Sequence, residues 1–187
     1  MKKTLLPVLL FVALLTLAGC GQKAEQVSNT IDAIKGAKEA ADLGKAVEQG
    51  NAEDAAKAIE NIANIGAEME KKEFEKTVPV DMPEKFPSQF SYSNGKTTEA
   101  SDQSTDEENL SITITQKTLD ELNAIKDFYK KALTENNWKI TVQNNSSDGG
   151  HFEARNDRTN EDATIDIAGN QYSKIREITI SYNKSAR

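Results

Sequence analysis

The only histidine of the chain stands near two carboxylates that a sheet would bring onto one face. His151 follows Gly149 and Gly150 at the start of a predicted strand, Glu153 lies two residues later, and Asp166 belongs to the next strand. Paired carboxylates can act as general acid and base, and a histidine among carboxylates can bind a metal ion. Such charges are more often simply solvated, so we interpret His151 as an exposed strand-edge residue and the two carboxylates as solvent-facing charges.

A second group of chemically active residues is acidic and lies in one predicted loop. Residues 101–109 (SDQSTDEEN) contain Asp102, Asp106, Glu107 and Glu108. Their spacing lacks the Asp-x-Asp-x-Asp-Gly pattern that wraps Ca²⁺, so it favours a mobile, structureless hairpin loop over a metal site. The sequence also has no glycine-rich phosphate loop, and one histidine offers little for nucleophilic catalysis. These residues predict a protein that is not an enzyme and needs no metal or cofactor.

The only cysteine closes an amino-terminal leader. Two lysines precede an apolar run that ends in Leu17-Ala18-Gly19-Cys20. The run is too short for a stable membrane span and has the pattern of a secretory signal. Its ending resembles the lipobox of bacterial lipoproteins, in which the leader is cut before the cysteine and the cysteine carries acyl chains. The resemblance implies a signal peptide at residues 1–19 and a membrane anchor on Cys20.

The residue after the cysteine indicates which membrane would hold the anchored protein. It is Gly21, whereas Asp is the usual mark of inner-membrane retention in lipoproteins of two-membrane bacteria. The resemblance therefore implies the periplasmic side of the outer membrane, or the outer face of the cell membrane in a single-membrane bacterium.

The charge of the mature chain limits its partners. Removing residues 1–19 takes away Lys2 and Lys3 and leaves 21 basic and 30 acidic residues, a formal net charge of −9. Such a surface repels nucleic acid and anionic headgroups, so membrane contact should come from the lipid on Cys20 alone.

Residues 23–76 have the composition of helix, because they contain no proline and are rich in Ala, Lys and Glu. Gly50 followed by Asn51 predicts a break and a new helix cap, and hence helices at about 25–49 and 52–76. Each has a narrow apolar stripe, built from Val27, Ile31, Ile34, Ala37, Ala41 and Gly44 in the first and from Ala55, Ile59, Ile62, Gly66 and Met69 in the second. We interpret residues 20–77 as a lipidated hairpin or stalk; the alternative is a surface that docks on a partner helix or on lipid.

Pro79, Pro83 and Pro87 mark the start of a second domain, predicted at 78–187. Apolar residues then alternate with polar ones in six short series, from Phe90 and Tyr92 at the start to Ile178, Ile180 and Tyr182 at the end. This period of two predicts half-buried antiparallel strands.

One helix interrupts the predicted strands at 118–136. Thr118 and Glu121 form an expected capping box at its start, and Asn136 and Asn137 end it. Its apolar face matches that of the sheet, so the sequence predicts an α+β sandwich in the order β-β-α-β-β-β-β. Phe128, Tyr129 and Trp138 are interpreted as core.

Two turns at strand ends, 144–150 and 157–162, are places where a binding module would carry specificity. In the first of them, Gly149 and Gly150 are free to take positive φ.

The second domain resembles a group of uncharacterised bacterial lipoproteins. The resemblance is carried by Pro79 to Pro87, by Ile125-Lys126-Asp127-Phe128-Tyr129-Lys130-Lys131-Ala132-Leu133 and by Asn137-Trp138-Lys139-Ile140. It implies a helix on an antiparallel sheet and no particular activity. Asn137 stands where that pattern has Gly, and Asn also tolerates the left-handed conformation.

Two hypotheses for function follow. The first is a non-enzymatic envelope lipoprotein that binds a protein or an envelope component. The alternative is a binder of a small ligand or peptide that uses the groove between the 118–136 helix and the sheet.

Overall fold

The computed structural model describes the backbone of residues 23–169 and 173–186, and the side chains from residue 31 onward. The leader and Cys20 lie outside the described residues. The chain divides into two compact units between Ile65 and Gly66. The predicted domain boundary at residue 78 stays a prediction.

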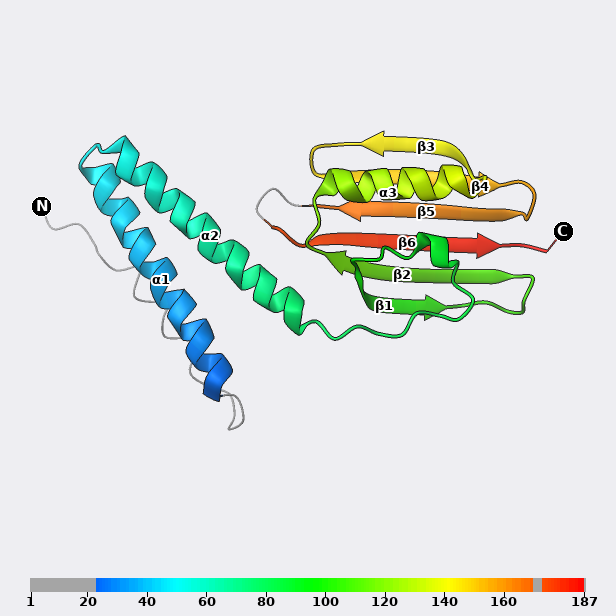
Figure 1. The fold of residues 1–187 in the computed structure, drawn as a ribbon, viewed down its shortest axis with the longest axis horizontal. Helices are drawn as coiled ribbons and strands as arrows, with labels where there is room; N and C mark the ends of the chain where they lie inside the picture. The colour runs from blue at the N-terminus through cyan, green and yellow to red at the C-terminus, as the bar shows by residue number, and fades with distance from the viewer. Residues whose placement is uncertain (1–22, 170–172, 187) are drawn as a thin grey trace, which may run out of the picture. The chain divides into compact units, whose positions relative to one another are not determined.

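The first unit is a helical hairpin (Figure 1). It consists of α1 (Lys23–Glu48) and the first half of α2 (Ala52–Lys76). Gly50 has a φ of +66°, which suits a glycine after a helix end. The side-chain oxygen of Asn51 accepts a hydrogen bond from the backbone N–H of Asp54 at 3.2 Å, so the predicted cap is confirmed.

From Ile31 onward, the apolar stripe predicted for α1 is exposed and is not the buried face of the hairpin. Ala46 and Ala58 are buried, and Asn61 Nδ2 donates to Glu39 Oε2 at 2.8 Å across the hairpin. Ile34, in contrast, is 64% exposed. Ala46 and Ala58 are small enough to let the two helices approach closely, whereas Ile34 stays outside.

The second unit is a six-stranded antiparallel sheet with one helix across a face (Figure 1). The predicted α+β class and the order β-β-α-β-β-β-β are confirmed. The sheet order is β1-β2-β6-β5-β4-β3. Besides the second half of α2, its elements are η1 (Ser88–Phe90), β1 (Lys96–Asp102), β2 (Leu110–Thr118), α3 (Leu122–Glu135), β3 (Lys139–Asn145), β4 (Gly149–Asn156), β5 (Glu161–Ala168) and β6 (Arg176–Lys184).

The core lies between α3 and the sheet. Ile125, Tyr129 and Leu133 of α3 are fully buried, and the ring of Trp138 meets that of Phe90 edge-on at a centroid distance of 5.0 Å. Each buried side chain of this size stabilises the fold by roughly 1.5–3 kcal/mol. The core positions of Tyr129 and Trp138 are confirmed, and Phe128 is a partly buried side chain packed against them.

The first predicted strand is wrong. Phe90 ends the 3₁₀ helix η1, and Tyr92 lies in the following loop, where its backbone N–H donates to the buried Gln116 Oε1 at 2.9 Å. Both residues are buried, so their spacing of two indicates burial correctly but not the backbone conformation. The strand that pairs with β2 begins at Lys96 instead.

The predicted capping box of α3 is also wrong. Thr118 still belongs to β2, and its hydroxyl accepts from the backbone N–H of Asp120 at 3.2 Å. Glu121 is the N-cap and makes no side-chain capping bond. At the other end Asn137 has a φ of +62°, as expected for a left-handed helix end, and Trp138 N–H donates to Leu133 O at 2.9 Å.

The two edge strands are irregular, whereas the four central strands pair in continuous register. The pairing of β1 shifts between Thr97 and Glu99, and that of β3 shifts between Ile140 and Val142. Such shifts are β-bulges, which bend an edge strand.

No helix within the described residues has the length and apolar character that a membrane span requires.

Candidate functional site

A cavity of about 460 Å³ opens at the end of the sheet where α3 begins. Three segments that are distant in sequence meet there: the first turns of α3, the β3–β4 turn, and the residues that flank the β5–β6 connection. The lining residues are Glu121, Leu122, Asn123, Lys126, Ser146, Ser147, Asp148, Gly169 and Arg176. Further along α3, the side chains of Ile125, Tyr129 and Leu133 are buried against the sheet, so this cavity lies at the start of the helix.

The start of α3 is fixed by hydrogen bonds to Asp120. Its carboxylate accepts from the Tyr92 hydroxyl at 2.7 Å and from Asn94 Nδ2 at 2.8 Å. Burial of Tyr92, together with the bond to Asp120, raises the pKa of the phenol to about 12. The first turn of α3, and with it one wall of the cavity, is therefore held on the loop after η1.

Glycines make room for the two cationic side chains of the cavity. A Cβ on Gly150 would lie 3.3 Å from the Lys126 side chain, and a Cβ on Gly169 would lie 3.3 Å from that of Arg176. Lys126 Nζ donates to Ser146 O at 2.7 Å, and the Arg176 guanidinium donates to Ser173 O. Each cation thus lies beside a glycine at a strand end.

The two loops of the cavity are joined by close backbone contact. Gly169 N–H donates to Asp148 O at 2.6 Å, and a Cβ on Gly149 would lie only 2.5 Å from Ile167 O. Neither Gly149 nor Gly150 has a positive φ, so the expected reason for these glycines is wrong. They are needed because two backbones and a lysine side chain approach them.

His151, Glu153 and Asp166 do come together, although away from the cavity. His151 Nδ1 lies 2.6 Å from Asp166 Oδ1, and its Nε2 lies 3.2 Å from Glu153 Oε1. His151 alternates with Gly150, which faces α3, so this cluster is on the other face of the sheet. Strand β4 lies between β3 and β5, so the expected strand-edge position of His151 is wrong.

The two carboxylates raise the pKa of His151 above its usual range, mainly through the hydrogen bond to Asp166 and then through that to Glu153. No group of three His, Cys, Asp or Glu residues in the described chain is arranged to hold a metal ion. The arrangement therefore favours the protonated form of the imidazole.

The acidic loop is more ordered than predicted. Ser101 and Asp102 belong to β1, and Asp106 Oδ1 accepts backbone N–H bonds from Glu108 and Asn109, both at 2.8 Å. Hydrogen bonds from Asn109 and Glu108 lower the pKa of the Asp106 carboxyl. Asp106 thus shapes its own turn, whereas Asp102 accepts a hydrogen bond from the backbone N–H of Ser104.

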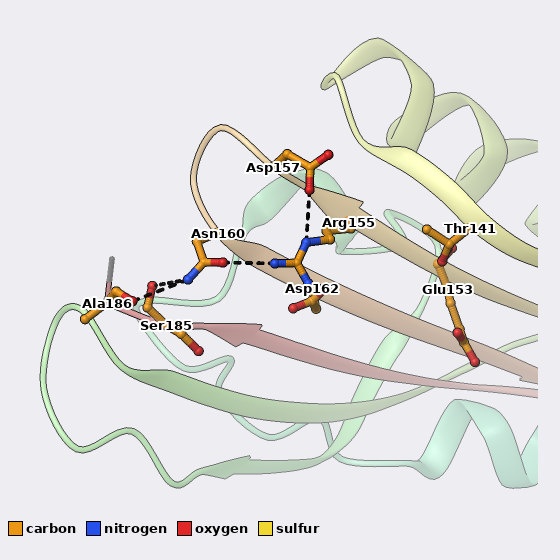
Figure 2. A network of polar contacts seen from close by, with 8 residues as sticks. All are labelled: Thr141, Glu153, Arg155, Asp157, Asn160, Asp162, Ser185 and Ala186. Atoms are coloured by element: carbon orange, nitrogen blue, oxygen red, sulfur yellow. Dashed lines mark hydrogen bonds and ion pairs between the residues drawn. The ribbon is translucent and has the colours of Figure 1, made fainter.

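A polar network occupies the opposite end of β4 and β5, and Figure 2 shows how its side chains converge. Arg155 pairs with Asp157 at 3.0 Å and Asp162 at 3.5 Å, and its Nη2 donates to Asn160 Oδ1 at 3.1 Å. Asn160 Nδ2 in turn donates to Ser185 O at 2.9 Å. The β4–β5 turn at 157–162 therefore holds the backbone at Ser185, and its predicted part in binding stays a prediction.

Part of the cavity is visible in the sequence. The turn at 144–150, which the sequence predicts to carry specificity, supplies Ser146, Ser147 and Asp148. Sequence reasoning misses Lys126 and Arg176 as site residues, because each lies in a regular element among core residues. The sequence shows only that Lys126 is a cation in the first half of a helix. Its closeness to the glycine pair of β4 becomes visible only in the fold.

Comparison with known families gives one finding. A family model described as START domain-like matches residues 94–173, which is less than half of the chain. The matched segment runs from the approach to β1 through β5, and it includes all the cavity-lining residues except Arg176. START-like domains are generally binding modules, which agrees with a binding role for this unit. No curated protein matches the chain.

Proposed function

We propose that this protein is a lipid-anchored lipoprotein of the cell envelope whose sheet unit binds a small polar ligand at the start of α3. The observation that carries the proposal is the coincidence of the cavity with the START-like segment. A volume of about 460 Å³ lies within the range of small-molecule sites, roughly 300–1,000 Å³.

Binding rather than catalysis is proposed because the described residues that line the cavity include neither histidine nor cysteine. His151, the only imidazole, is on the other face of the sheet and engaged with two carboxylates.

The anchor is proposed from the lipobox ending at Cys20. Two or more acyl chains hold a protein on a bilayer, whereas a single chain gives only marginal binding. The expected location is the periplasmic side of the outer membrane, or the outer face of the cell membrane if there is one membrane. Wild-type chain that takes up labelled fatty acid and fractionates with membranes, and a Cys20→Ser chain that does neither, would support the anchor; equal behaviour would refute it.

The ligand-binding part is tested with a metabolite and muropeptide panel on the purified full-length chain, read by thermal shift, because a ligand that binds only the folded state stabilises it. Asn123→Trp places a large ring in the cavity mouth. Ala124→Trp is the matched control, since Ala124 is exposed on the same helix turn but does not line the cavity. A hit lost in the first variant and kept in the second supports the proposal. A panel without hits, or hits unaffected by Asn123→Trp, contradicts it.

A second candidate function, docking of a protein partner on the helical unit, is favoured by its exposed apolar side chains. Ile34 and Val47 of α1 are 64% and 65% exposed, and Ile59 of α2 is 57% exposed. A photo-crosslinker at Ile34, compared with one at the exposed Glu53, tests this surface in cells. Specific capture of one protein from Ile34 alone supports it; equal capture from both positions does not.

A further inference from the structure

The cavity carries both signs of charge on walls that face a common space. Two of its lining side chains are cations, Lys126 and Arg176, and two are anions, Glu121 and Asp148. Among the described residues, Leu122 is the only large apolar one that lines the cavity. We propose, resting on the function proposed above, that the ligand is a small zwitterion with a free ammonium and a free carboxylate, of the amino acid or dipeptide class.

The cations are placed to receive a carboxylate. Lys126 Nζ uses one of its three donors on Ser146 O at 2.7 Å, so its charge is held at the β3–β4 turn. Arg176 donates to Ser173 O, so its positive charge is held at the start of β6. Both side chains line the same cavity, so a carboxylate that enters it meets positive charge from α3 and from β6.

The anions are placed to receive an ammonium. Among the described residues, the Glu121 carboxylate accepts no capping hydrogen bond, although Glu121 is the N-cap of α3. Asp148 Oδ1 accepts one hydrogen bond, from Ser147 at 2.9 Å, and its backbone is fixed by the bond from Gly169. A carboxylate has about four acceptor positions in total, so both anions keep capacity for an ammonium donor.

Other ligand classes fit the lining less well. A lipid chain needs apolar walls, and Leu122 alone does not supply them. A simple anion would satisfy the cations and leave two carboxylates beside it, which is electrostatically unfavourable. A zwitterion matches both pairs of charges at once.

The test uses L-alanyl-L-alanine, its N-acetyl derivative and its carboxy-terminal amide, titrated into the full-length chain. The amide signals of Asn123, Lys126 and Gly169 report binding by NMR. We expect the free dipeptide to shift these signals and each derivative to bind about tenfold more weakly or worse, because each lacks one charge. Free amino acids are titrated in parallel.

Charge variants separate the two ends of the ligand. Lys126→Met should weaken binding of the free dipeptide but not that of its amide, which has no carboxylate to lose. Lys130→Met, an exposed lysine one turn later, is the control. Glu121→Gln should weaken the free dipeptide but not the N-acetyl form, with Glu135→Gln as control.

The outcomes are distinct. Equal binding of the dipeptide and both derivatives would overturn the zwitterion, as would charge variants that leave dipeptide binding unchanged. If amino acids and dipeptides fail to bind while a neutral compound from the panel binds and is blocked by Asn123→Trp, the zwitterion is wrong and the proposed function stands. If nothing binds, both are wrong.

Discussion

The Lys96 ammonium closes the carboxy-terminal end of the helix that contains Phe74. Lys96 Nζ lies 2.8 Å from the main-chain oxygen of Phe74 and 4.8 Å from the centre of its ring, and it also donates to Glu75 O at 2.9 Å. The last carbonyls of a helix have no intrahelical partner and carry partial negative charge. One side chain of β1 therefore satisfies the end of α2 by charge and by hydrogen bonds.

Replacing this lysine should loosen the end of α2. Lys96→Met is expected to cost about 1–2 kcal/mol, because charge-assisted hydrogen bonds to helix-end carbonyls are lost. The measurement is hydrogen exchange of the amides at residues 74–77, compared with amides in β6. Lys130→Met is the control, and equal exchange in both variants would show that the contact contributes nothing.

The pKa of His151 should depend on Asp166 more than on Glu153. Its folded-state pKa is raised, so the imidazole binds its proton more tightly when folded. The resulting stabilisation is fully present below the unfolded value near 6.5 and is lost as the pH rises through the raised folded pKa. NMR titration of the untagged chain, which has one histidine, should show a larger fall in pKa for Asp166→Asn than for Glu153→Gln. A His151 pKa that is the same in all three proteins would show that the two carboxylates do not raise it.

Replacement by glycine should change stability in opposite directions at two asparagines that have nearly the same backbone conformation. Asn137 and Asn160 have φ values of +62° and +56°. Asn137→Gly relieves a left-handed residue and should stabilise by about 0.5–1 kcal/mol. Asn160→Gly removes the bonds to Arg155 and Ser185 and should destabilise by about 1 kcal/mol or more. Urea unfolding measures both, and changes of the same sign would contradict the distinction between the two residues.

Alanine substitutions at the two glycines of β4 should have different effects, one on stability and the other on ligand affinity. Gly149→Ala puts a methyl group against the backbone oxygen of Ile167 and should destabilise by about 2 kcal/mol. Gly150→Ala meets the flexible Lys126 side chain at 3.3 Å and the end of the Ile167 side chain at 3.5 Å, which is ordinary contact, so it should fold nearly as well but displace the lysine. The expected result is a lower melting temperature for the first variant and a weaker ligand affinity for the second. Matching melting temperatures would overturn the difference.

Local features are predictable from sequence where a single residue type decides them. Gly50 and Asn51 end one helix and begin the next, and Asn137 ends α3, because these residues favour those conformations wherever they stand. Phe90 and Tyr92 mislead, since a 3₁₀ turn and the loop after it bury alternate residues as a strand does. Thr118 misleads because its hydroxyl can serve a turn at a strand end as readily as a helix cap.

The cavity is less accessible to sequence reasoning. Lys126, Asp148 and Arg176 come from three separate segments, and only strand order brings them to one end of the sheet. The His151 cluster is easier, because the alternation of strands places residues 151, 153 and 166 on one face before any pairing is known.

The bulges of β1 and β3 affect whether copies of this chain can join their sheets edge to edge at high protein concentration. An open sheet has two free edges, and a straight edge can recruit the edge of another copy to extend the sheet. Here both edges are bent, one near Thr97 and the other near Ile140, while the regular strands are enclosed between them. The edge strands of two copies therefore do not pair in register, and this opposes polymerisation into a continuous sheet.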